Sequence, residues 1–149
     1  MSTTILKLIP HAPDYLPIKT AQEKASTWLS SIFPDSSRIE VNAWDEVKFV
    51  DPGENFEHIL CSFCNENLKL DWWHKVMDLA CEDDFKNLEV QVPCCHSIVS
   101  LNELDYVWAA GFARFVLEIF EPNSTLSSES LSLLEQLLEC RLRQIWARY

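Results

Sequence analysis

The sequence predicts an α+β fold with a small antiparallel or mixed sheet, a helix-containing zinc ribbon, an N-terminal helix and a long C-terminal helix. Three observations lead to this prediction. Two segments carry apolar residues at helical spacing, several short segments alternate apolar and polar residues, and two cysteine-rich turns flank a helical segment. The 149 residues fit a single domain, 1–149, with a core over 15–122, the ribbon at 56–100 and the terminal helix at 124–149.

The first predicted helix spans residues 17–33. Pro17 suits a first helical turn, and the polar run from Pro34 ends the helix. Its apolar stripe comprises Ile18, Ala21, Ala25, Trp28, Leu29 and Ile32. Residues 38–51 then alternate as strands do, and Asp45-Glu46 is expected to form a turn between two short strands. Residues 56–60 are expected to lead as a strand into the first cysteine turn.

A second helix is predicted from Asp71, as its cap, to about Asp84, and residues 88–92 resemble a strand that enters the second cysteine turn. Residues 112–120 alternate like a half-buried strand. From about Ser127 to Arg148 the sequence predicts a terminal helix, whose stripe comprises Leu131, Leu134, Leu138, Leu142 and Ile145. This stripe is wide enough to pack on the parent domain or to bind a partner, and both readings stay open.

Four cysteines are the strongest chemical signal in the chain. Cys61 and Cys64 form a C-x2-C turn, and Cys94-Cys95 follow after 29 intervening residues. Such pairs of thiolate turns typically bind a structural zinc ion, so we expect these four as its ligands. His96 is the reserve ligand, since adjacent residues often cannot both turn to one ion. Free thiols in a reducing compartment and, less so, a disulfide framework are the alternatives.

Charge and glycine content exclude several function classes. The net charge is −11, and all of it falls in residues 1–122, which hold 20 acids and nine bases. Such a field repels phosphate backbones, so no nucleic-acid partner is expected. With only Gly53 and Gly111, no phosphate-binding loop is present. Neither a signal peptide nor a membrane span is visible, and a cytoplasmic location is expected.

Several motifs together resemble a group of uncharacterised small bacterial zinc-ribbon-like proteins. They are Cys61-Ser-Phe-Cys64, Leu70-Asp-Trp-Trp73, Pro93-Cys-Cys95, Leu101-Asn-Glu-Leu-Asp-Tyr106 and Gly111-Phe-Ala-Arg-Phe115. The resemblance covers about residues 15–122 and implies a zinc-ribbon-like core without implying an activity. Members of the group carry glycine after the paired cysteines, where this chain has His96.

No catalytic set is convincing. His74 and Cys81 lie seven residues apart on the predicted helix, which is about 10 Å at 1.5 Å per residue and too far for a nucleophile–base pair. Deaminases combine H-x-E with P-C-x-x-C, and this chain has only Pro93-Cys94 of that pattern. His58 could contribute to a metal site. We therefore expect no enzymatic activity, with an unusual zinc-dependent hydrolase or deaminase as the alternative.

The functional hypothesis is an acidic protein-binding module, specifically a bacterial immunity or antitoxin protein that blocks a toxin with a basic cleft. The expected contact residues are Glu82, Asp83, Asp84, Glu103 and Asp105. A regulatory adaptor that docks through the terminal helix is a further alternative, and the acidity can also serve solubility alone. The oligomeric state stays open.

Overall fold

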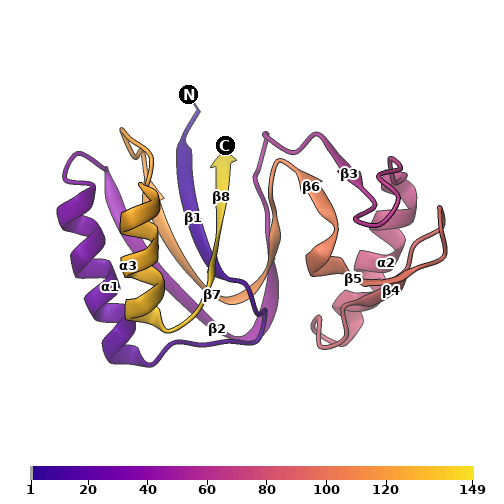
Figure 1. The fold of residues 1–149 in the computed structure, drawn as a ribbon, viewed down its shortest axis with the longest axis horizontal. Helices are drawn as coiled ribbons and strands as arrows, with labels where there is room; N and C mark the ends of the chain where they lie inside the picture. The colour runs from indigo at the N-terminus through magenta and orange to yellow at the C-terminus, as the bar shows by residue number, and fades with distance from the viewer. Residues whose placement is uncertain (1) are drawn as a thin grey trace.

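The computed structural model describes residues 2–149 and confirms the α+β class (Figure 1). One lobe is a four-stranded sheet covered on one face by two helices. The other, smaller lobe extends from the opposite side of the sheet and carries the cysteine turns (Figure 1). Across residues 2–149, no helix has the length and apolar character needed to cross a membrane.

The sheet has the order β2-β7-β1-β8, with antiparallel pairing throughout. Its strands are β1 (Thr4–Pro10), β2 (Arg38–Val50), β7 (Gly111–Phe120) and β8 (Leu142–Arg148). Strand β7 lies between two neighbours and is buried on both faces, not half-buried as its alternation predicted. Strand β2 runs through Asp45-Glu46, so the expected turn there is a register shift between Ala43 and Lys48.

Helices α1 (Lys19–Ile32) and α3 (Ser128–Leu138) pack on the same face of this sheet (Figure 1). The amphipathic stripe predicted for residues 17–33 accounts for α1, whose Ala25 and Leu29 are fully buried. On α3, Leu134 and Leu138 point into the same core, together with Leu117 of β7. This burial of apolar side chains between helices and sheet is the main stabilising contribution of the larger lobe.

The predicted terminal helix over 127–148 is wrong in its second half. Helix α3 ends at Leu138, where Glu139 takes a left-handed conformation with φ of 57°, and the chain turns into β8. Strand β8 pairs with β1 over seven residue pairs, from Thr4 with Arg148 to Pro10 with Leu142. Backbone pairing with a strand at the other end of the chain therefore outweighs the helical spacing of Leu142 and Ile145.

The smaller lobe contains α2 (Leu70–Glu82) and two separate two-stranded sheets. Strand β3 (His58–Leu60) pairs with β6 (Asp105–Val107), and β4 (Glu89–Gln91) pairs with β5 (Ile98–Ser100). The zinc ribbon expected over 56–100 is not supported, because β3 takes its partner strand from beyond residue 100. Helix α2 confirms the predicted helix, although Lys69 and not Asp71 precedes it as the cap residue.

An aromatic cluster joins the two lobes. Phe49 of β2 and Phe112 of β7 have ring centroids 5.1 Å apart, and Phe49 also lies 5.5 Å from Trp73 of α2. Trp73 is buried, so it belongs to the core of the smaller lobe rather than to a ligand site. The Nε1 group of Trp73 donates to the hydroxyl of Tyr106, which donates to the Leu101 carbonyl. These contacts hold α2 and β6 against the larger lobe, in the part of the chain that carries the cysteine turns.

Candidate metal centre

The four predicted cysteines converge in the smaller lobe. Their sulfur atoms all lie within 4.8 Å of one another, with 3.8 Å between Cys61 and Cys95 and 3.3 Å between Cys64 and Cys94. Sulfurs at the corners of a zinc tetrahedron with bonds of about 2.3 Å are about 3.8 Å apart. A disulfide would need a separation of about 2.05 Å, and all four cysteines are free. The cluster therefore fits one thiophilic metal ion.

Two tight backbone turns position the thiols. The first turn runs from Leu60, the last residue of β3, to Asn67, and these two residues form an isolated antiparallel bridge. The second turn joins β4 to β5. In each turn one residue has a left-handed backbone, Asn65 with φ of 62° and His96 with φ of 61°. Asn tolerates this conformation comparatively well, and glycine would adopt it without strain. This is why glycine suits the position after a cysteine pair.

His96 is thus a turn residue and does not join the cluster. Its N–H donates to the Val92 carbonyl at 3.0 Å, and its own carbonyl accepts from Nε2 of Gln91. Among residues 2–149, the four cysteines are the only group of three or more potential metal ligands whose ligand atoms lie close together. The expectation that His96 serves as the reserve ligand, and that His58 contributes, finds no support in this geometry.

The thiols differ in their surroundings. Hydrogen bonds from the side chain and backbone of Ser97 lower the pKa of Cys95 to about 7. Desolvation, together with hydrogen bonds among the cysteines, raises the pKa of Cys94 to about 12. Cys61 is fully buried, whereas the other three lie at the surface. A bound cation would draw the protons off all four thiols, so metal binding here would release protons.

The acids predicted as contact residues lie in two regions, residues 82–84 at the end of α2 and residues 103–105 around one pocket. Glu82 ends α2, Asp83 follows it, and Asp84 lines a groove between the lobes. Glu103 belongs to a short 3-10 turn, η1 (Leu101–Glu103). Its carboxylate lies 3.3 Å from Nε2 of His11 and 3.8 Å from Arg143, while Asp105 lies in β6. Glu103 is therefore already partnered within the chain.

The groove has a volume of about 410 Å³ and both apolar and acidic walls. Its apolar residues include Val47, Phe85 and Leu88, and its acids are Asp14, Asp45, Glu46 and Asp84. Lys86 and Arg114 also line it, and Nε of Arg114 donates to the Trp44 carbonyl. Across residues 2–149, none of the ion pairs involves these four acids. Asp14, Asp45 and Glu46 were not among the predicted contact residues, because Asp14 and the Asp45-Glu46 pair lie far in the chain from Asp84.

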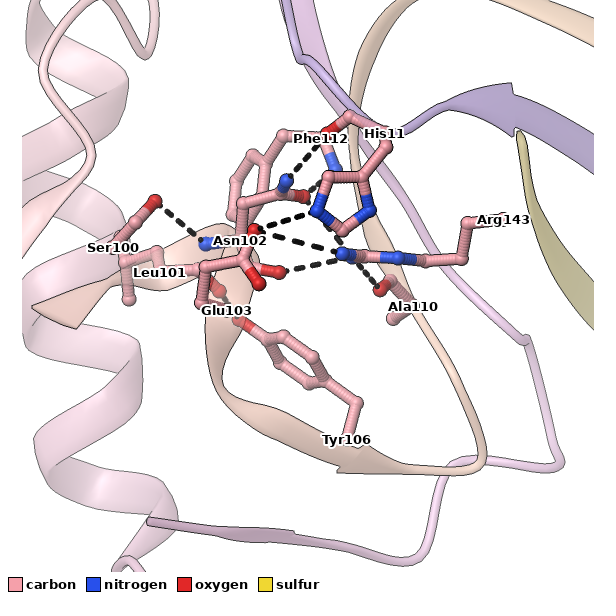
Figure 2. A network of polar contacts seen from close by, with 9 residues as sticks. All are labelled: His11, Ser100, Leu101, Asn102, Glu103, Tyr106, Ala110, Phe112 and Arg143. Atoms are coloured by element: carbon pink, nitrogen blue, oxygen red, sulfur yellow. Dashed lines mark hydrogen bonds and ion pairs between the residues drawn. The ribbon is translucent and has the colours of Figure 1, made fainter. Parts of the chain in front are cut away.

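A buried polar network joins the two lobes beside this region (Figure 2). Asn102, only 2% exposed, accepts at Oδ1 from the Phe112 N–H and from Nη1 of Arg143, and donates from Nδ2 to the His11 carbonyl. Nη1 of Arg143 also donates to the carbonyls of Asn102 and Ala110. This network was missed in the sequence, since its residues come from four distant segments.

The fold and the cluster define an α+β protein whose smaller lobe carries four converging thiols. The chain matches no protein-family model, and neither a curated protein nor a solved structure gives a significant match. The resemblance to the uncharacterised zinc-ribbon-like group therefore stays a prediction.

Proposed function

We propose that this chain is a non-enzymatic protein-binding module whose smaller lobe is stabilised by one structural zinc ion. The convergence of Cys61, Cys64, Cys94 and Cys95 within 4.8 Å is the observation that carries the proposal. Zinc is favoured because thiolate-rich tetrahedral sites select it among the common biological cations. Four protein sulfurs would fill its shell and leave no position for a water molecule, which supports a structural role over a catalytic one.

The zinc part is tested by single cysteine substitutions. Cys61→Ser should release the metal and lower the free energy of unfolding, because a structural site contributes its binding energy to folding. Cys140→Ser is the matched control, since Cys140 lies after α3 in the other lobe. Zinc content by elemental analysis and thermal unfolding are the measurements. Equal stability of the two variants, with no zinc in the wild type, would refute this part.

The partner is proposed to be a basic protein. Within residues 2–149, the groove offers four carboxylates without an ion-pair partner beside apolar side chains, against two bases, Lys86 and Arg114. The chain as a whole has a net charge of −11. A cationic segment with an apolar residue would complement both features. The more specific proposal is an immunity or antitoxin protein that covers the basic cleft of a toxin. Long-range attraction would accelerate such binding and weaken as salt rises.

Charge reversal tests this proposal with the product of the neighbouring gene as the toxin candidate. Asp14, Asp45 and Glu46, all exposed, are changed together to Lys. Asp84 is left unchanged because of its left-handed backbone, φ of 59°. The control changes three exposed acids elsewhere to Lys, namely Glu23, Asp35 and Asp78, with the same shift in net charge.

The groove variant should bind the toxin at least about tenfold more weakly than the control variant. Both variants lose the same long-range attraction, but only the groove variant also loses direct charge pairs at the contact. Surface plasmon resonance at two salt concentrations measures this. A toxin that neither co-purifies with the wild type nor loses toxicity on co-expression contradicts the immunity proposal. Equal weakening by both triple variants would instead contradict the groove as the contact surface.

A further inference from the structure

The two cysteine turns have the same backbone hydrogen bonds. In the first, the Cys61 N–H donates to the Glu66 carbonyl at 2.9 Å, and the Asn65 N–H donates back to the Cys61 carbonyl at 3.0 Å. In the second, the Val92 N–H donates to the Ser97 carbonyl, and the His96 N–H to the Val92 carbonyl, both at 3.0 Å. With Asn65 and His96 both left-handed, residues 61–66 and 92–97 correspond one to one.

This correspondence places the cysteines in unequal positions. Cys64 matches Cys95, so each turn provides its second ligand at the same place. Cys61, however, matches Val92, and both side chains are fully buried. The second turn therefore has an apolar residue where the first turn has its first ligand. Its additional cysteine, Cys94, occurs two residues later and corresponds to Phe63.

The position of Cys94 is a poor one for a ligand. In the first turn the same position directs Phe63 outward, with 63% of its surface exposed. The Sγ atom of Cys94 nevertheless lies 3.3 Å from that of Cys64, so it reaches the cluster from this position. Cys95 is held by a hydrogen bond with the Ser97 hydroxyl, with 3.3 Å between Sγ and Oγ. The amide two residues after Cys94, that of His96, is already bonded to the Val92 carbonyl.

From these observations we infer that Cys61, Cys64 and Cys95 form the retained part of the metal centre, and that Cys94 is its exchangeable fourth ligand. When the Cys94 thiolate leaves, its coordination position takes an external monodentate ligand, either a small thiolate or an imidazole. This inference rests on the proposed metal binding. It adds that the four cysteines are not equivalent and that the opening faces solvent, where Cys94 is exposed.

Cobalt(II) is the probe, because its visible absorption reports the number of thiolate ligands in a tetrahedral site. The Cys94→Ala protein should lose clearly less Co²⁺ affinity than the Cys64→Ala protein, since the latter removes a ligand from a regular turn position. Cys64 is the matched control because it is also exposed and adjoins Cys94. Added ethanethiol or imidazole should restore a four-ligand spectrum to Cys94→Ala and not to Cys64→Ala.

Position 92 provides a second test. A cysteine placed there should face the metal as Cys61 does, and it is smaller than the buried valine that it replaces. Combining Val92→Cys with Cys94→Ala should therefore recover the Co²⁺ affinity that Cys94→Ala loses. Thermal unfolding of each variant checks that the fold persists.

The outcomes separate the two proposals. A wild type without Co²⁺ or Zn²⁺ binding overturns the metal proposal itself. Wild-type binding with equal losses in Cys94→Ala and Cys64→Ala, or no effect of external ligands on Cys94→Ala, overturns the exchangeable ligand alone. Failure of Val92→Cys to recover affinity in a folded protein overturns the correspondence of the two turns.

Discussion

Replacing Asn102 by alanine is the sharpest test of how the two lobes are joined. Asn102 is 2% exposed, and its side chain makes three hydrogen bonds, to Phe112, Arg143 and the His11 carbonyl. Alanine would leave the buried Phe112 N–H and the His11 carbonyl without these partners. Arg143 would keep its bonds to two carbonyls, those of residue 102 and Ala110.

The expected loss follows from those two orphaned groups. The Phe112 N–H is buried, and leaving such a group unpaired costs about 1–3 kcal/mol. The carbonyl of His11, an exposed residue, costs less because water can replace part of the lost bond, so Asn102→Ala should lower the free energy of unfolding by about 1–4 kcal/mol. This is a large part of a typical total of about 5–15 kcal/mol. For a chain of this length about 2–4 °C is lost per kcal/mol, and the Tm should fall by roughly 2–16 °C.

Urea and thermal unfolding followed by circular dichroism, at constant zinc, measure the effect. Asn123→Ala is the control, because Asn123 is exposed and makes one side-chain hydrogen bond of 3.4 Å. Asn102→Asp should lie between them, since it keeps the oxygen acceptors for Phe112 and Arg143 but loses the donor to His11. An Asn102→Ala protein as stable as Asn123→Ala would refute the idea that this network joins the lobes.

Two further predictions concern the sheet. Gly53→Ala should lower the free energy of unfolding by about 2 kcal/mol or more in urea titrations, because φ is +60° and the new Cβ would collide with the Arg148 carbonyl; wild-type stability would contradict this close approach. Asp51 keeps a pKa below its ordinary 3.8, because hydrogen bonds from Tyr149 and the charge of Lys7 outweigh the effect of burial. The Asp51 carboxylate therefore stabilises the fold above pH 3.8, and this stabilisation is lost as the pH falls below 3.8. In unfolding titrations, the free energy of unfolding of Asp51→Asn should thus fall less steeply with decreasing pH than that of the wild type. Equal slopes for the two proteins would exclude this role of Asp51.

Much of the fold was predictable where the signal is local. The stripe of α1 and the spacing of Cys61 and Cys64 each reflect contacts within a few residues, and both predictions agree with the structure. The region of β8 was not predictable in this way. Leu142 and Ile145 continue the helical spacing of α3, and Glu139, without glycine to mark it, turns the chain into a strand that pairs with β1.

The candidate site was predictable in its residues and not in its geometry. Spacing identified all four cysteines, because C-x2-C and C-C pairs are local patterns. The inequality of Cys94 depends on backbone hydrogen bonds that align Val92 with Cys61, which no ligand spacing indicates. Likewise, the sequence does not indicate that Glu103 has ion-pair partners, because His11 and Arg143 are distant in the chain and lie close to it only in the folded protein.

X-ray absorption at the zinc edge, on protein purified without chelator, imidazole or added thiol, determines the ligands of the proposed zinc ion. We expect about one zinc per chain with four sulfur neighbours at about 2.3 Å and no oxygen or nitrogen neighbour. A shell that includes oxygen or nitrogen would contradict the four-thiolate centre and favour the hydrolase or deaminase alternative. Protein without zinc would contradict the centre altogether.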